Sequence, residues 1–324
     1  MSVASYAGAS DTGRKRRRNE DSFVIAPPLF AVADGMGGAQ AGEIASKLAA
    51  AALEDTDPGT MSGEERVTML IQEANRRVHE RATADPSTSG MGTTMTVALV
   101  EGMLVAFGHV GDSRAYRYRN GSIEQITEDH SLVNELLKSG KLSPEEAGTH
   151  PQRSVITRAV GTDPDVDVDS FTVEAEAGDV FLICSDGLTD MVEDDDILDV
   201  LEKFHDDLDR ATKSLVSAAN RGGGEDNITV VAFRVTPDDG SGKTEPLPAL
   251  DAAETMEDVR APTVDTMVVP PEEVEHVFVE PGSPEAAAAT RREPISPAAR
   301  VRLVLTMLVL LAVAAVLLVW GLLR

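Results

Sequence analysis

The stretch LFAVADGMGG, residues 29–38, carries the pattern on which the interpretation of the chain rests. Five apolar residues, the length of a buried strand, end at Asp34, and glycines follow. The pattern recurs at residues 180–187, where VFLICS leads into Asp186 and a glycine. A carboxylate at the end of a core strand is held rigidly, so we expect such carboxylates to converge.

Further acidic residues stand at strand ends: Glu20 and Asp21 precede the strand-like run 22–26, and Asp226 precedes the run 228–231. Convergent carboxylates repel one another and would take up protons unless a cation lies between them. Oxygen ligands with no histidine nearby favour Mg²⁺ or Mn²⁺, and Gly35 would let a main-chain carbonyl approach the ion. Two such ions can share a water and lower its pKa, which points to hydrolysis of a phosphate ester.

Composition excludes several other classes of site. The 324 residues include 55 Asp and Glu, 29 Lys and Arg, and one cysteine, for a net charge of −26. One cysteine cannot form a disulfide framework or a multi-thiolate metal site. The acidic excess repels phosphate backbones, so we expect no nucleic acid partner.

Periodicity predicts an α+β fold for residues 1–236. Strand-like runs lie at 22–26, 29–33, 94–100, 104–110, 114–118, 179–184 and 228–235, and helical patterns at 43–53, 64–84, 131–139, 195–204 and 208–220. Neighbouring strands follow one another directly, which favours antiparallel hairpins over parallel strands joined by helices. We therefore expect sheets inside and helices outside.

Two further regions follow this domain. Residues 237–300 are acidic, rich in proline and poor in hydrophobic periodicity, which predicts a disordered linker. Its short apolar runs 266–269 and 277–279 either dock on a partner or have no role. Residues 301–323 are almost wholly apolar, and the 21 residues from 303 onward would form a helix of roughly 31 Å, enough to cross a bilayer.

The charges around this apolar stretch predict its orientation. Four arginines, at positions 291, 292, 300 and 302, precede the apolar run that starts at residue 303, and only Arg324 follows. Positive residues stay in the cytoplasm, and the first 18 residues lack the apolar run of a secretory signal. We expect a single-pass tail anchor in the cell membrane with the preceding domain in the cytoplasm.

A set of motifs in a fixed order identifies a resemblance to a known family. They are Gly13-x-x-Arg16-x-x-Asn19-Glu20-Asp21, Ala33-Asp34-Gly35-Met36-Gly37-Gly38, Gly92-Thr93-Thr94, Gly111-Asp112-Ser113-Arg114, Ser185-Asp186-Gly187-Leu188-x-Asp190 and Glu225-Asp226-Asn227-Ile228-Thr229. Over residues 5–235 the chain resembles the metal-dependent protein phosphatases of type 2C, and in particular their bacterial serine/threonine branch.

The resemblance implies a four-layer α-β-β-α sandwich with two central antiparallel sheets and a centre of two Mg²⁺ or Mn²⁺ ions. By this resemblance, Asp34 would bridge both metals, and Asp186 and Asp226 would hold the first. Glu20 and the Gly35 carbonyl would face the second metal, and Asp21 would orient metal-held water. Asp112 and Asp190, with Asp186, would hold a third metal. Asn227 would fix the turn at Asp226.

Two further positions bear on mechanism. Arg16 matches the phosphate-binding arginine of the family, and a guanidinium can hold phosphate oxygens in a planar, bidentate grip. The other basic residues of the run 14–18 are interpreted as solvated surface. Met36 stands where many eukaryotic relatives carry a histidine proposed to protonate the leaving group, so the general acid is unassigned.

The function expected from these features is hydrolysis of phosphoserine and phosphothreonine by a metal-bridged hydroxide. Partners would be phosphorylated proteins, including the substrates of membrane-associated serine/threonine kinases that the enzyme opposes. The alternatives left open are a catalytically silent phosphoprotein-binding module, suggested by Met36, and a metal phosphodiesterase. Residues 128–169 resemble a flap bordering the cleft, in which His130 is either structural or chemical.

Overall fold

The computed structural model describes residues 2–37, 41–56, 60–148, 150–237 and 267–268. Except for Pro237, Met267 and Val268, the predicted linker lies outside these ranges, as does the whole apolar stretch 301–323. Within the described ranges, each helix falls short of the length and apolar character that a bilayer crossing demands. The membrane anchor and the domain boundaries therefore remain predictions.

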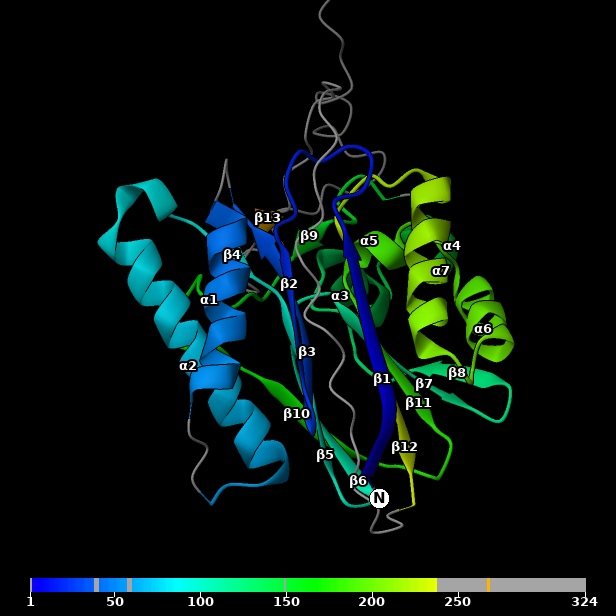
Figure 1. Ribbon diagram of the computed structural model, residues 1–324. Coiled ribbons are helices and arrows are strands. Elements are labelled where there is room, and N and C mark those ends of the chain that lie inside the picture. Colours follow the sequence, from blue (N-terminus) through cyan, green and yellow to red (C-terminus); the bar gives the residue numbers. More distant parts are fainter. Residues whose placement is uncertain (1, 38–40, 57–59, 149, 238–266, 269–324) are drawn as a thin grey trace, which may run out of the picture. The chain divides into compact units, whose positions relative to one another are not determined.

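Two antiparallel sheets form the centre of the molecule (Figure 1). The first has the strand order β1 (Ser2–Asp11), β12 (Ile228–Thr236), β11 (Val180–Cys184), β7 (Arg114–Arg119) and β8 (Ser122–Gln125). The second has the order β10 (Asp169–Glu174), β6 (Leu104–Val110), β5 (Met95–Glu101), β3 (Leu29–Met36) and β2 (Asp21–Ala26), with β4 (Gly92–Thr93) paired to the end of β3. The strand ends that carry the predicted ligands thus come from both sheets.

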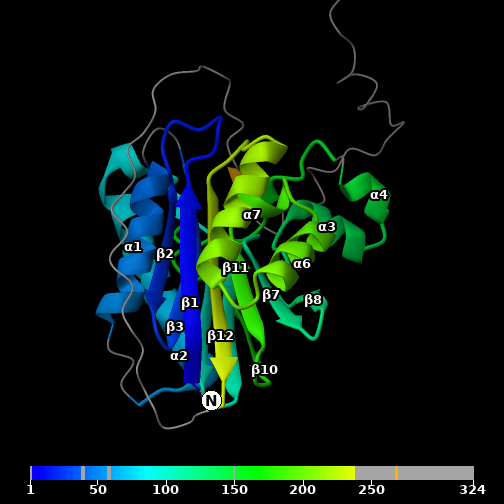
Figure 2. The ribbon, with the colours of Figure 1, turned by 45° about the vertical axis from the view of Figure 1, so that its right-hand side comes forward.

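Helices cover the outer face of each sheet, as Figures 1 and 2 show. The second sheet is covered by α1 (Ala41–Asp55) and α2 (Gly63–Ala84), the latter followed by the 3₁₀ turn η1 (Pro86–Thr88). The first sheet is covered by α6 (Asp194–Lys203) and α7 (Leu208–Gly222). Shorter elements lie at the end of the sheets, namely α3 (Leu132–Lys138), α4 (Pro144–Ala147), β9 (Val155–Ile156) and α5 (Asp186–Thr189). The expected four layers are present.

Three apolar layers hold the four structural layers together. Between the sheets, Phe30 of β3 stacks on Phe233 of β12 with ring centroids 4.3 Å apart, and both are fully buried. Alanines along one face of α1 allow this helix to pack closely on the second sheet. Helix α7 packs against the first sheet through Leu208, Ala211 and Leu215, which are three and four residues apart and so share one helix face. The sheets are thereby fixed relative to each other.

The predicted α+β class with antiparallel sheets is confirmed, but several strands were missed. The sequence of β1, SVASYAGASD, has small residues and no clear apolar alternation, yet it pairs along its length with β12. Likewise β10, which reads DSFTVE, pairs with β6 from Asp169↔His109 to Glu174↔Leu104. Pairing with a distant, strongly apolar strand decided both, because strand propensity depends on the neighbours a residue packs against.

Candidate metal centre

Carboxylates from both sheets meet at one end of the sandwich. Asp21 at the start of β2 is the register partner of Asp34 near the end of β3. In the other sheet, β11 leads through Ser185 into Asp186 at the start of α5, and Asp226 lies two residues before β12. Figure 1 shows these strand ends at the same edge of the two sheets. The convergence expected from the sequence is present.

The charges of these carboxylates act on one another. Burial, followed by the charges of Asp21 and Asp186, raises the pKa of Asp34 well above its usual range. Burial and the charges of Asp112 and Asp226 do the same to the pKa of Asp186. Burial also raises the pKa of Asp21 to about 6. Burial and the charges of neighbouring acids therefore raise the proton affinity of Asp34 and Asp186.

Two carboxylate oxygens of this group have no protein partner among the described residues. One oxygen each of Asp21 and Asp186, Oδ1 in both cases, is buried without a hydrogen-bond partner. Within the described ranges, no three acidic, histidine or cysteine side chains already surround one point as ligands. Buried carboxylate oxygens of this kind fit a hard divalent ion.

The position of Asp34 is fixed by two threonines. Its N–H donates to Thr94 Oγ1 at 3.0 Å, and its carbonyl oxygen accepts from the Thr94 N–H and from Thr93 Oγ1, both at 2.8 Å. Both backbone polar groups of the predicted bridging ligand are thus satisfied. The sequence showed these threonines as a motif but not what they do.

Glu20 and Gly35, predicted to face the second metal, present their oxygens to one small space. A Cβ built on Gly42, at the start of α1, would lie 2.7 Å from the Gly35 carbonyl oxygen and 2.9 Å from Glu20 Oε2. A Cβ on Gly35 would itself lie 2.2 Å from the Gly42 carbonyl oxygen, so both positions need glycine. Gly42 was missed in the sequence, where nothing distinguishes it from a helical glycine.

Asn227 connects the segments that carry two of the predicted ligands, Glu20 and Asp226. Its Oδ1 accepts from the Glu20 N–H at 2.7 Å, and its Nδ2 donates to the carbonyl oxygens of Thr12 and Arg18 at 2.9 and 2.8 Å. Its own N–H donates to Asp226 Oδ1 at 2.8 Å. This role is wider than the predicted fixing of the turn at Asp226.

Arg16 lies at the centre, as its spacing predicted. Its Nη2 donates to Asp226 Oδ2 at 2.8 Å, and its side chain is 19% exposed, whereas the other four basic residues of the run 14–18 are exposed. Burial alone would lower the pKa of Arg16, but the charges of Asp226, Asp34 and Glu20 raise it overall. A fixed positive charge therefore borders the carboxylates.

The residues predicted for a third metal lie next to the first group. Burial and then the charges of Asp129 and Asp190 raise the pKa of Asp112 to about 7. The side chain of Asp190 is 38% exposed, and its Oδ2 lies 3.7 Å from Arg153 Nη2. Desolvation of its less exposed part still raises its pKa. Asp112 and Asp190 both act on the pKa of Asp186, so the three carboxylates form one electrostatic group.

Ser185 is a functional position that the sequence interpretation left without a role. Its Oγ donates to Asp21 Oδ2 at 2.9 Å and accepts the Thr229 N–H at 3.0 Å. It therefore joins the ends of β11 and β12 to the acid at the start of β2. Its place directly before Asp186 was the only signal in the sequence.

Met36 and the histidines have packing or structural contacts. Met36 packs with Ile156 and Ala159 in a small buried cluster. His130 Nδ1 accepts the Gly111 N–H at 3.0 Å, and His130 Nε2 lies 3.1 Å from Asp169 Oδ2. Burial lowers the pKa of His109 to about 3, so that ring is neutral. These contacts favour the structural interpretation of His130.

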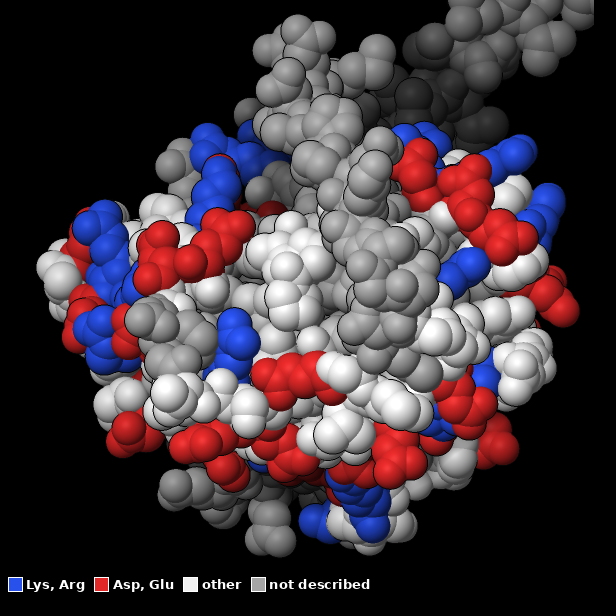
Figure 3. Space-filling view, turned by 60° about the horizontal axis from the view of Figure 1, so that its bottom comes forward, with Lys and Arg blue, Asp and Glu red and all other residues white. Residues whose placement is uncertain are grey.

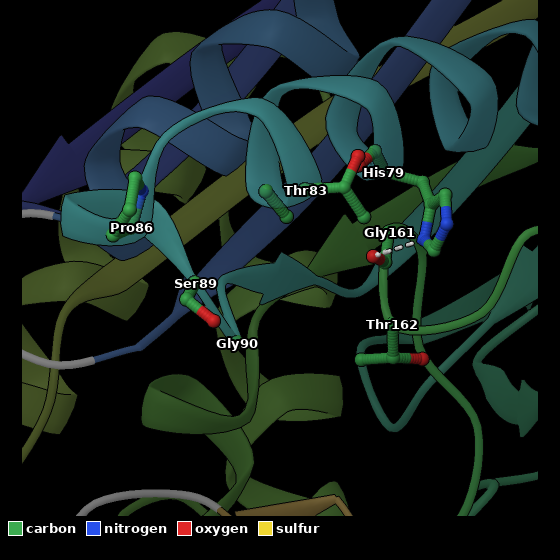
Figure 4. A pocket seen from close by; sticks show the side chains of 8 residues that line it. His79, Thr83, Pro86, Ser89, Gly90, Gly161 and Thr162 are labelled. Carbon is green, nitrogen blue, oxygen red and sulfur yellow. Dashed lines mark hydrogen bonds between the residues drawn. The ribbon is translucent and has the colours of Figure 1, made fainter.

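A separate hollow of about 640 Å³ lies between the end of α2 and the loop at Gly161 (Figure 4). His79 points its Nδ1 toward the Gly161 carbonyl oxygen at 3.3 Å. Its lining contains no carboxylate, so the chemistry of the carboxylate cluster does not extend into it. Elsewhere acidic and basic side chains intermingle on the surface, as on the face shown in Figure 3.

The fold and the ordered carboxylates define a class of metal-dependent phosphatase. Residues 14–219 match the family described as protein phosphatase 2C, and the chain belongs to that family. It is 41% identical over 247 residues to the serine/threonine protein phosphatase PstP of Mycobacterium tuberculosis, a match covering 76% of this chain and 47% of that protein. A serine/threonine phosphatase of Listeria welshimeri is 41% identical over 233 residues, covering 68% of this chain and 92% of the relative.

A solved structure shares the architecture. It is the catalytic domain of the serine/threonine protein phosphatase PstP in complex with two manganese ions, with a TM-score of 0.66 and 38% identity. The match covers 73% of this chain and 100% of that one. The predicted family, with its bacterial serine/threonine branch, is thereby confirmed.

The raised pKa values predict how pH acts on the metal-free protein. Asp21 and Asp112 have pKa values of about 6 and about 7 when folded, above the usual aspartate value, so the folded state binds more protons. Their stabilising contribution is complete at low pH and is lost as pH rises through 6 to 7. Lowering the pH of chelator-treated protein from 8 to 5 should raise its Tm by several degrees, at about 2–4 °C per kcal/mol.

Differential scanning calorimetry across this range measures the effect. The matched variant Asp34→Asn removes the charge at the centre of the group and should flatten the pH dependence. With saturating Mn²⁺ the trend should reverse, because protons and metal compete for the same oxygens. A Tm independent of pH in the metal-free wild type would contradict the raised pKa values of these groups.

The space at Gly42 predicts a metal-binding defect, together with some loss of stability because the Gly35 backbone would have to shift. In Gly42→Ala the new Cβ would enter the space between Glu20 Oε2 and the Gly35 carbonyl, although alanine favours the helix. We expect one of two Mn²⁺ ions to bind about tenfold more weakly, measured by isothermal titration. Gly148→Ala is the control, because a Cβ there meets nothing within 4 Å. Equal Mn²⁺ binding by both variants would exclude this space as a metal position.

Proposed function

We propose that the protein is a metal-dependent serine/threonine phosphatase that hydrolyses phosphoserine and phosphothreonine in proteins. The observation that carries the proposal is the group of Asp34, Asp186 and Asp226 at the ends of two sheets, with Arg16 bound to its edge. The relatives named above support it, although the chain spans about half the length of the Mycobacterium protein.

We infer that the centre holds two Mn²⁺ or Mg²⁺ ions. Asp34, Asp186 and Asp226 would hold one, and Asp34, Glu20 and the Gly35 carbonyl the other. Asp112 and Asp190, with Asp186, form a candidate third position. Such ions supply hydroxide near neutral pH and neutralise charge on a phosphate ester. The manganese ions in the similar solved structure support Mn²⁺.

The chain's own residues would orient the substrate and the attacking water. Arg16 Nη2 donates a hydrogen bond to Asp226 Oδ2, and this bond would orient the guanidinium plane for phosphate oxygens. Asp21 Oδ2 accepts a hydrogen bond from the Ser185 hydroxyl, so Asp21 Oδ1 would be the oxygen that accepts a hydrogen bond from water. These contacts fix both groups before substrate arrives, and fixed groups are needed for catalysis by positioning.

The alternative is a silent phosphoprotein-binding module. Met36 motivates it, because a thioether cannot protonate a leaving group. Against it, Met36 has a packing role with Ile156, and the carboxylates remain together at mutual electrostatic cost. A binding module has no need to retain such an arrangement.

Hydrolysis of a phosphothreonine peptide with Mn²⁺, and then with excess chelator, tests the proposal. We expect turnover that needs the metal and falls by at least about 10³-fold in Asp34→Asn and Asp186→Asn, since metal-assisted chemistry supplies most of such a barrier. Arg16→Ala should retain Mn²⁺ and raise KM. Peptide binding without turnover by metal-loaded wild type would favour the silent module instead.

We further propose that residues 301–323 anchor the enzyme in the cell membrane with the phosphatase domain in the cytoplasm. The length of the apolar stretch and the arginines before it support this topology. A linker of about 64 residues would give a reach of roughly 45 Å, at about 5–6 Å times the square root of its length. Membrane-associated serine/threonine kinases and their substrates would be the partners, in signal transduction.

Deleting residues 301–324 tests the anchor. The truncated protein should leave the membrane fraction and keep the Mn²⁺-dependent turnover of the full chain, because the carboxylate cluster lies elsewhere. Fractionation with phosphopeptide hydrolysis measures both properties. Persistent sedimentation of active truncated protein with membranes would refute the assignment.

A further inference from the structure

The strand β9, in the segment that resembles a flap, has a neighbour on each edge. On one edge Ile156 forms an antiparallel bridge with Ser131. On the other, Val155 and Ile156 pair in parallel with Met267 and Val268, which form β13. A strand residue bridges one partner per edge, so the two neighbours of Ile156 lie on opposite sides. A piece of the predicted linker therefore occupies the second edge of β9.

The strand β9 is also joined to the metal centre. Ile156 is fully buried and packs with Met36, two residues beyond Asp34. Arg153, two residues before β9, lies 3.7 Å from Asp190. Figure 1 shows β9 and β13 at the end of the sheets where β3 ends and α5 begins. A strand added to β9 thus acts on a segment that already contacts the carboxylate cluster.

The sequence around β13 suits strand addition and limits it to a short piece. Residues 266–269, TMVV, are uncharged and rich in β-branched side chains, whereas the surrounding linker is acidic. Pro262 precedes the piece, and Pro270 and Pro271 follow it. Proline lacks the N–H that a continued ladder needs, so pairing ends there.

The chain is long enough to make this contact within one molecule. Residues 237–266 separate β12 from β13, and 30 residues can span roughly 30 Å even without being extended, at about 5–6 Å times the square root of their number. Tethering also gives the segment an effective concentration in the millimolar range, which lets a short ladder form.

We propose that Met267 and Val268 of the predicted linker add as an intramolecular strand to β9, restrain the flap segment beside the carboxylates and so slow entry of extended phosphoprotein chains. The effect on substrates rests on the proposed phosphatase function, whereas the pairing itself does not. Strand addition to an exposed edge is a general mode of peptide recognition. Here β13 of the predicted linker already occupies the edge of β9 to which a peptide could otherwise add. The hydrolysis of a small aryl phosphate should be unaffected, because this substrate has no peptide chain to accommodate.

The test uses the full chain in detergent micelles and the double variant Met267→Pro/Val268→Pro, which removes both N–H donors of β13 without touching the folded core. Val277→Pro/Val279→Pro, in the other apolar run of the linker, is the matched control. Hydrogen exchange at residues 150–158 is measured with kcat/KM for a phosphothreonine peptide and for p-nitrophenyl phosphate. A synthetic peptide of residues 262–273 is then added to the double variant.

We expect exchange at β9 to rise at least about threefold in the double variant alone, since a removed ladder frees its amides, and millimolar peptide to restore protection. Phosphopeptide kcat/KM should rise at least about threefold, with p-nitrophenyl phosphate unchanged. Unchanged exchange at β9 would overturn the pairing. Changed exchange with unchanged phosphopeptide turnover would overturn the restraint on substrates. Inactivity of every variant toward both substrates would refute the proposed function, and exchange would still decide the pairing.

Discussion

Repulsion between carboxylates is the constraint on which the structure depends. The charges of Asp21, Asp112 and Asp186 raise the pKa of Asp34, a costly arrangement for a chain that already carries a net charge of −26. Protons can relieve this cost at low pH and divalent ions at neutral pH. The fold therefore holds in place an unfavourable group of charges whose natural complement is a cation.

The two-sheet sandwich supplies the rigidity that such a group requires. Stacked Phe30 and Phe233 lock the sheets together, so strand ends far apart in the chain keep a constant separation. Polar contacts then secure the ends themselves: Thr94 holds the backbone of Asp34, and Asn227 links Glu20 to Asp226. The backbone contacts of Thr94 with Asp34 and of Asn227 with Glu20 leave the side-chain oxygens of those two acids outside the contacts that position them.

The environment of Met36 changes the meaning of a departure from the family pattern. In the sequence it stands where relatives carry a histidine, and it raised the possibility of a silent protein. In the structure it joins the carboxylate-bearing strand β3 to Ile156 of β9 through apolar packing. Met36 therefore connects the metal centre to β9, and β9 pairs with β13 of the predicted linker.

The sequence alone determined the α+β class, the family, the strand-end aspartates and the importance of Arg16, because apolar runs that stop at acidic residues are local patterns. Only tertiary structure decided that β1 and β10 are strands, that Gly42 keeps a space open between two oxygens, and that β9 pairs with β13. These features depend on neighbours at least 60 residues away in the chain or on the absence of an atom. Local preference carries no record of either, since a strand edge or an empty space exists only once the chain has folded.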